Sequence, residues 1–113
     1  VDAPCSNSGV LARRVEAKYR FDEESVTSLE GVQRQVLADA VRLLTPVGAG
    51  QERGKLLYST CSVDRRENEA QAAWMERWHA LKTLRTSQRM PEGNPGGGGA
   101  EGYSDGSFAV LLG

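Results

Sequence analysis

The sequence has few of the side chains that build metal centres and cross-linked scaffolds. Its 113 residues include two cysteines, Cys5 and Cys61, and a single histidine, His79. A structural zinc site needs clustered cysteine and histidine ligands, and a disulfide scaffold needs a higher density of cysteine, so neither is predicted. Long apolar runs are also missing, because no stretch approaches the roughly 18 apolar residues of a membrane helix. We therefore expect no metal and no membrane partner, and the expected location is cytoplasmic.

An excess of basic charge is missing as well. The 14 lysines and arginines are balanced by 15 acidic residues, which gives a formal net charge of -1. This balance argues against a protein that holds nucleic acid through a large basic surface of its own. A local cluster remains at Arg13, Arg14, Lys18 and Arg20, where charge alone leaves phosphate contact and a solvated face equally open. Hydrophobic residues at 39% and charged residues at 26% are typical of one small folded domain.

The chain does not begin with methionine, and its first residues resemble the end of a strand. Pro4 cannot lie within a central strand, and residues 6–9 (SNSG) favour a turn. We expect the chain to be the later part of a longer domain.

Two helices are indicated by periodicity. Apolar residues recur at helical spacing over 28–44, and Thr27 with Glu30 three residues later is typical of a capping box. A similar box at Asp64 and Glu67 predicts a second helix that continues to about Leu81. Its buried face is expected to comprise Ala70, Ala73, Trp74, Trp78 and Leu81.

Strands are predicted between these helices and after them. Residues 54–59 (GKLLYS) form a short apolar run between turn signals, as expected for a buried parallel strand. Residues 82–89 indicate a weaker strand, and 107–112 (SFAVLL) a final one. Four consecutive glycines predict an irregular loop within 91–105. The alternation of strands and helices predicts an α/β sheet with helical crossovers.

In such a sheet, ligands bind beyond the carboxyl ends of the strands. Cys5 follows the N-terminal strand stub, and Cys61 follows the strand at 54–59. We therefore expect both cysteines to line one crevice. On cysteine count alone, a disulfide between them and a pair of free thiols are equally open.

The two cysteine segments resemble motifs of one enzyme family. Residues 2–11 (DAPCSNSGVL) resemble motif IV of the Sun-type RNA (cytosine-5) methyltransferases, which include bacterial small-subunit rRNA methyltransferase B, and 58–63 (YSTCSV) resemble motif VI. The acidic triplet at 67–69 (ENE), Gln33 and the pair Asp105–Gly106 also fall at family positions. The resemblance covers nearly the whole chain. It implies the C-terminal half of a Rossmann-like methyltransferase sheet with crossover helices.

The resemblance implies methyl transfer from S-adenosyl-L-methionine to C5 of a cytosine in RNA, ribosomal RNA foremost. A thiolate that adds to C6 makes C5 electron-rich enough to accept a methyl group. The family pattern assigns this attack to Cys61, assistance in product release to Cys5, and orientation of base and cofactor to Asp2. A helix that starts near Asp64 would favour the thiolate through its dipole. The residues expected to contact RNA are Arg13, Arg14 and Lys18.

The glycine-rich cofactor loop of the family has no counterpart in this sequence. Residues 1–113 are therefore expected to form the C-terminal part of the catalytic domain and to be inactive alone. The rival hypothesis is a non-catalytic RNA-binding or ribosome-assembly module that keeps the fold. Structural roles stay open for Glu67 as a helix cap and for Gln33 as a partner of backbone groups. Trp74 and Trp78 are expected in the core rather than in a base-stacking platform.

Overall fold

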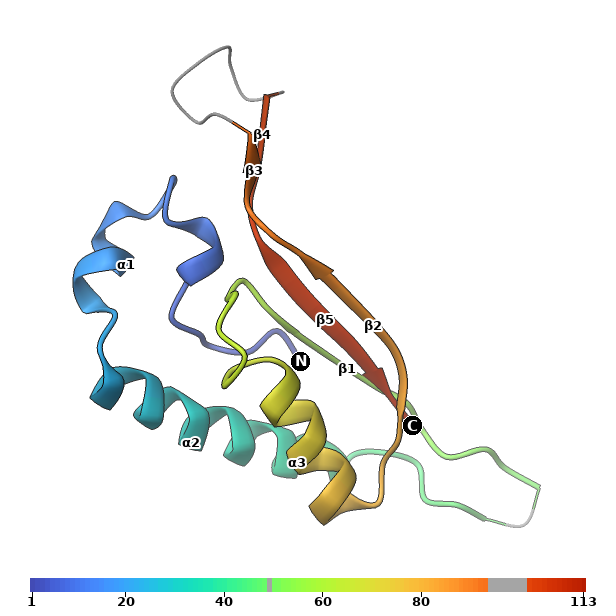
Figure 1. The fold of residues 1–113 in the computed structure, drawn as a ribbon. Coiled ribbons are helices and arrows are strands. Elements are labelled where there is room, and N and C mark those ends of the chain that lie inside the picture. Colours follow the sequence, from blue (N-terminus) through green and yellow to red (C-terminus); the bar gives the residue numbers. More distant parts are fainter. Residues whose placement is uncertain (49, 94–101) are drawn as a thin grey trace.

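A computed structural model describes residues 1–48, 50–93 and 102–113. Within these ranges, a short 3₁₀ helix, η1 (Ser8–Val10), precedes α-helices and strands that follow one another along the chain (Figure 1). The helices are α1 (Val15–Arg20), α2 (Glu23–Val41) and α3 (Glu69–His79). The strands are β1 (Leu56–Thr60), β2 (Thr83–Arg89), β3 (Glu92–Gly93), β4 (Tyr103–Ser104) and β5 (Ser107–Leu112). The strands expected at 82–89 and 107–112 are thus confirmed.

The main sheet has three strands in the order β1-β5-β2, and β5 is antiparallel to both neighbours. The N-terminal residues extend the free edge of β1 in parallel, because the Ala3 N–H donates to the Ser59 carbonyl at 2.9 Å and Ser59 N–H donates to Val1 at 2.9 Å. The stub, α2 and β1 therefore form a strand–helix–strand unit. The predicted α/β class is confirmed. The strands β3 and β4 pair separately, within the segment that was expected to be irregular.

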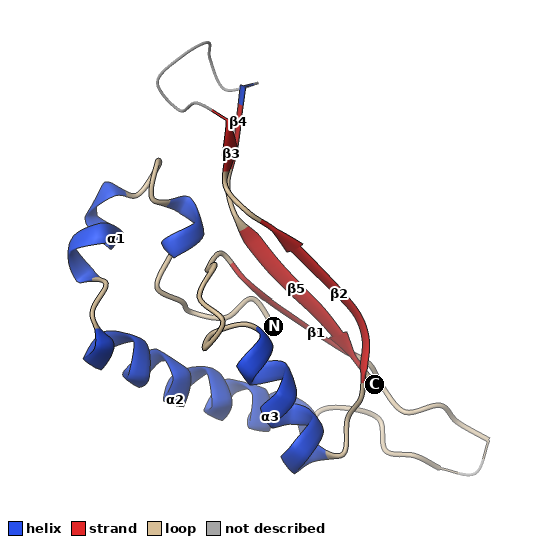
Figure 2. Ribbon diagram, viewed as in Figure 1, coloured by secondary structure: helices blue, strands red, loops and turns tan. Residues whose placement is uncertain are grey.

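The core lies between the sheet and the helices α2 and α3, which cover one side of it (Figure 2). Burial alternates along β1 and β5, so that every second side chain faces the helices. The buried parallel strand expected at 54–59 is β1, which is parallel to the N-terminal stub but antiparallel to β5 and is buried on one face only, because Leu57 is 55% exposed. The fully buried apolar side chains of this layer include Leu37, Met75, Phe108, Val110 and Leu112. Each contributes about 1.5–3 kcal/mol by leaving water.

Helix α2 begins five residues before the expected start, at Glu23 rather than Ser28. Its N-cap is Asp22, whose carboxylate accepts a hydrogen bond from the Ser25 N–H at 2.8 Å. This bond lowers the pKa of Asp22. The capping box at Thr27 is therefore wrong, because Thr27 lies inside the helix. An aspartate before two glutamates is an equally good start signal.

Helix α3 begins later than predicted, at Glu69, after a turn over 65–68. The expected capping box at Asp64 is wrong, because the turn directs Glu67 into the interior instead of along the helix. The buried face also differs, since α3 buries Gln71, Ala72 and Met75. Trp74 packs at the border of the core, whereas Trp78 is 63% exposed, so the core assignment fails for Trp78. The four glycines at 96–99 lie outside the described residues.

Candidate functional site: two thiols in one crevice

The site forms where two loops meet. One loop follows the N-terminal stub and carries Cys5, and the other follows β1 and carries Cys61. Their Sγ atoms lie 3.1 Å apart and share a hydrogen bond, and both residues are free cysteines that are partly buried. The structure confirms that the two thiols line one crevice, and it shows no disulfide between them.

The cysteine crevice, which we define as the hollow shared by Cys5 and Cys61, has a volume of about 560 Å³. Asp2 borders it, and its Oδ1 accepts a hydrogen bond from the Ser59 hydroxyl at 3.3 Å. Asp105 lies at the same crevice and pairs with Arg13 at 3.0 Å. The other oxygen of Asp105 is buried and has no hydrogen-bond partner among the described residues. The crevice thus combines two thiols with two carboxylates.

The buried side chain of Glu67 connects the two cysteine loops through hydrogen bonds. It accepts hydrogen bonds from the N–H of Ser6 at 2.8 Å and from the Ser6 hydroxyl at 2.6 Å. On the other loop, the Ser62 hydroxyl donates to the same carboxylate. Gln33 donates both to Glu67, at 3.2 Å, and to the Pro4 carbonyl, at 2.9 Å. Glu67 is 0% exposed, so these donors replace the hydrogen bonds to water that its side chain loses on burial.

Alternation along residues 58–62 (YSTCS) explains how Cys61 comes to face the crevice. The inward side chains bond to the turn that precedes α3: the Tyr58 hydroxyl donates to the Glu67 carbonyl at 2.6 Å. The Thr60 hydroxyl donates to the Asn68 side chain at 2.6 Å, and Asn68 donates to the Ser62 carbonyl at 2.8 Å. Successive side chains point in opposite directions along a strand, so Cys61 is directed away from this network.

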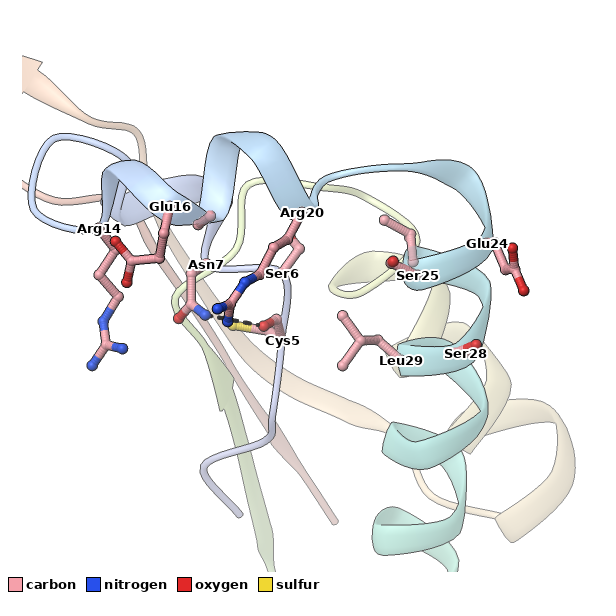
Figure 3. A pocket seen from close by; sticks show the side chains of 12 residues that line it. Cys5, Ser6, Asn7, Arg14, Glu16, Arg20, Glu24, Ser25, Ser28 and Leu29 are labelled. Carbon is pink, nitrogen blue, oxygen red and sulfur yellow. Dashed lines mark hydrogen bonds between the residues drawn. The ribbon is translucent and has the colours of Figure 1, made fainter.

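Asn7 contacts both cysteines. Its side-chain oxygen accepts a hydrogen bond from the Cys61 thiol at 2.9 Å, and its amide donates to the Cys5 carbonyl at 3.3 Å (Figure 3). Its backbone has φ 59°, a left-handed conformation that asparagine adopts more readily than most residues. The turn therefore places a polar side chain directly against both sulfur-bearing residues.

Gly9 locks the first loop to its neighbours through the backbone. Its N–H donates to the Cys61 carbonyl at 2.9 Å, and its carbonyl accepts from the Gly106 N–H at 2.7 Å. A Cβ at Gly9 would lie 2.6 Å from the Cys61 carbonyl oxygen and 2.8 Å from that of Gly106. Only glycine fits this close approach of three backbone segments.

The surroundings of Cys61 favour its neutral form. Burial raises the pKa of the Cys61 thiol to about 12, and the hydrogen bond with Cys5 and the negative charge of Asp2 act in the same direction. The expectation that the local fold favours a thiolate is therefore wrong for the described chain. Because α3 begins only at Glu69, its positive end does not follow directly on Cys61.

The expected RNA-contacting residues fall into two places. Arg13 and Arg14 border the cysteine crevice, whereas Lys18 borders a separate apolar hollow beside Phe21 and Val63. The sequence interpretation did not give functional weight to Asn7, and it left Glu67 undecided between a cap and a functional group. For Glu67 the signal was its place in the acidic triplet, and for Asn7 it was its place in the segment that resembles motif IV, although that resemblance assigned Asn7 no role.

No helix in the described ranges is long and apolar enough to cross a bilayer.

Comparison with other proteins gives consistent matches. Residues 1–98 match the family model described as 16S rRNA methyltransferase RsmB/F. Ribosomal RNA small subunit methyltransferase F of Salmonella paratyphi B is 36% identical over 80 residues, which are 71% of this chain and 15% of that protein. The protein of the same name from Pectobacterium atrosepticum is 33% identical over 76 residues, which are 67% of this chain and 14% of that protein.

Solved structures share the fold. The crystal structure of PH0851 superposes with a TM-score of 0.77 at 28% identity, over 98% of this chain and 25% of that one. NSun6 from Pyrococcus horikoshii, solved with SFG, gives a TM-score of 0.66 at 24% identity, over 99% of this chain and 28% of that one. The chain therefore spans about 15% of the length of the first curated relative and 25% of PH0851.

Proposed function

Because the chain belongs to the 16S rRNA methyltransferase RsmB/F family, we propose that it supplies the thiol chemistry of an S-adenosyl-L-methionine-dependent RNA (cytosine-5) methyltransferase. The observation that carries the proposal is the pair of free thiols, 3.1 Å apart, in a crevice that Asp2 borders. Residues 1–113 would form the C-terminal part of the catalytic domain, with the cofactor loop upstream. Alone, this part would be inactive.

Cys61 is the proposed nucleophile. Its sulfur forms a bond to C6 of cytosine, and the displaced ring electrons make C5 reactive toward a methyl group. After C5 is methylated, a base removes the C5 proton, and the bond between sulfur and C6 breaks with its electrons returning to Cys61. Cys5, whose Sγ lies 3.1 Å from the nucleophile, assists this release. The target base must leave any stacked helix, because C6 is otherwise shielded.

Asp2 is the proposed orienting residue. Its carboxylate is exposed at the cysteine crevice, where it suits both a hydrogen-bond donor of the base and a positively charged ligand. S-adenosyl-L-methionine would supply an electrophilic methyl group on a positively charged sulfur. A positive charge or a donor beside Asp2 would offset one of the causes that raise the pKa of Cys61. This would lower the pKa of Cys61, while burial, the largest cause of its rise, would have to change with the bound RNA.

RNA is the proposed partner, and ribosomal RNA the favoured class, since the family is named for 16S rRNA. Arg13 and Arg14 border the crevice and are the proposed contacts for phosphates near the target base, where Arg13 would exchange its ion pair with Asp105 for a phosphate. Lys18 lies beside a different hollow, so it would contact the RNA farther from the target.

The test uses the full-length protein that contains this chain, with 16S rRNA and a labelled methyl donor. We expect Cys61→Ala to reduce methyl transfer to background and Cys5→Ala to accumulate protein covalently joined to RNA. Arg42→Gln, on the exposed end of α2, is the control and should transfer at the wild-type rate. Full activity of Cys61→Ala would contradict the proposed role. RNA binding without methyl transfer in the wild-type protein would instead support the non-catalytic module.

A further inference from the structure

A second hollow lies on the other side of Cys5 from the cysteine crevice. It has a volume of about 490 Å³ and opens between α1 and the first turns of α2. Figure 3 shows Arg20 reaching from α1 toward Cys5, with Ser25 and Leu29 of α2 opposite. We call it the α1–α2 hollow. Cys5, Asn7 and Arg14 border both hollows, so the two are neighbours along one surface.

We propose that the α1–α2 hollow is the binding site for the nucleotide next to the target cytosine, with Arg20 and Arg14 as ligands of its phosphate. This inference rests on the proposed function, because it extends the site at which the RNA is methylated. A target base turned into the cysteine crevice must keep its phosphodiester links to its neighbours. The adjoining hollow is the place where one neighbour can lie.

The charges at the α1–α2 hollow suit a nucleotide better than an apolar ligand. Within the described ranges, the guanidinium groups of Arg14 and Arg20 form neither ion pairs nor side-chain hydrogen bonds. Both side chains are exposed, so they are available to an anion. Arginine holds phosphate through paired N–H donors. Arg13 and Arg66 differ in this respect, because each is already paired with carboxylates.

Two carboxylates also border the α1–α2 hollow, and their negative charge disfavours binding of an isolated anion such as inorganic phosphate. Glu16 lies near Arg14, and Glu24 stands at the outer rim (Figure 3). A carboxylate can accept a hydrogen bond from the exocyclic amine of a base, as it does when proteins read cytosine. A nucleotide carries both a phosphate and a base edge, so it matches this mixture of charges. The volume of the α1–α2 hollow also falls within the range of small-molecule binding sites.

The test measures binding of fluorescent single-stranded RNAs to the full-length protein without a methyl donor. Each RNA has one cytidine, and uridines extend it one nucleotide at a time on the 5′ or the 3′ side. We expect one of the first extensions to raise affinity about tenfold in the wild-type protein, as a charged hydrogen bond allows. In Arg20→Gln the gain in affinity from the same extension should shrink below about twofold. The slope of log affinity against log salt concentration should decrease in magnitude by about one.

Two further variants separate the subsite from a fold defect. Ser28→Trp fills the α1–α2 hollow from the exposed face of α2 and should also abolish the gain in affinity on extension of the RNA. Arg20→Lys keeps the positive charge and should retain part of that gain. Arg42→Gln is the matched control and should keep the full step. An unchanged step in both Arg20→Gln and Ser28→Trp, or equal weakening for every RNA length, would overturn the inference. Because this assay needs no methyl transfer, its outcome is independent of the test of the proposed function.

Discussion

At the residue scale, the central feature is Cys61, the proposed nucleophile, whose surroundings raise the pKa of its thiol. Cys61 donates its thiol hydrogen to Asn7 and lies 3.1 Å from Cys5, while Asp2 stands at the same crevice. Burial of the thiol, its hydrogen bond with Cys5 and the negative charge of Asp2 all raise the pKa of Cys61. The raised pKa is therefore compatible with a nucleophile that ionises only with substrate.

The first prediction concerns the pH dependence of Cys61. Its pKa of about 12 is raised by burial first and by Cys5 next. Replacing Cys5 by alanine removes the second cause, so the pKa should fall and the thiolate fraction at a given alkaline pH should rise. The pH profile of iodoacetamide alkylation, read by mass spectrometry at the Cys61 peptide, should therefore shift to lower pH. A profile that stays in place or moves to higher pH would show that Cys5 does not act on Cys61.

The second prediction concerns Glu67. Alanine there leaves the donors of Ser6, Ser62 and Gln33 unsatisfied in the interior, which should lower the free energy of unfolding by about 2–4 kcal/mol. Urea unfolding of the full-length protein measures this loss. Glu52→Ala is the control, because Glu52 is exposed, and its change should stay within about 0.5 kcal/mol. Equal stability of the two variants would mean that Glu67 does not hold the loops together.

At the element scale, the strand ends and turns position the site, and the helices support them. β1 and the N-terminal stub run side by side, so their carboxyl ends bring Cys61 and Cys5 to the same edge. The sequence allowed this juxtaposition to be predicted, because each cysteine follows the carboxyl end of an expected strand. It did not allow the turn over 65–68 to be predicted. Helix propensity there competes with long-range bonds from Glu67, and no local pattern reveals such partners.

The third prediction uses two glycines with opposite expected effects. Gly9→Ala would force a Cβ against the Cys61 and Gly106 carbonyls, so it should cost about 1–3 kcal/mol of stability and reduce methyl transfer strongly. Gly31→Ala, inside α2 with nothing within 4 Å, should stabilise the protein by about 0.5–1 kcal/mol. Thermal unfolding and methyl transfer are measured for both. Wild-type stability and activity in Gly9→Ala would contradict the close packing of the loops.

At the scale of the whole molecule, the succession of helices and strands along the chain and the two cysteine segments were predictable from the sequence, whereas the antiparallel order β1-β5-β2 was not. The alternation of expected strands and helices led to the α/β class, the apolar run at 107–112 located β5, and a weaker pattern at 82–89 located β2. The exposure of Leu57 and Trp78 was not predictable, because burial depends on which face the helices cover. Likewise, Asn7 acquires its contacts only when distant loops meet. Local patterns therefore identified the elements, while the details of the site depended on tertiary contacts.

The most direct test of the account identifies the sulfur that bonds to the base. Full-length protein is incubated with S-adenosyl-L-methionine and RNA that contains 5-fluorocytidine, whose fluorine cannot leave as a proton does, so that the covalent adduct persists. Mass spectrometry of the digested adduct then locates the modified nucleotide on the protein. The account predicts a methylated fluorocytidine attached to Cys61. Attachment to Cys5 instead, or the absence of any adduct while methyl transfer to ordinary RNA proceeds, would contradict it.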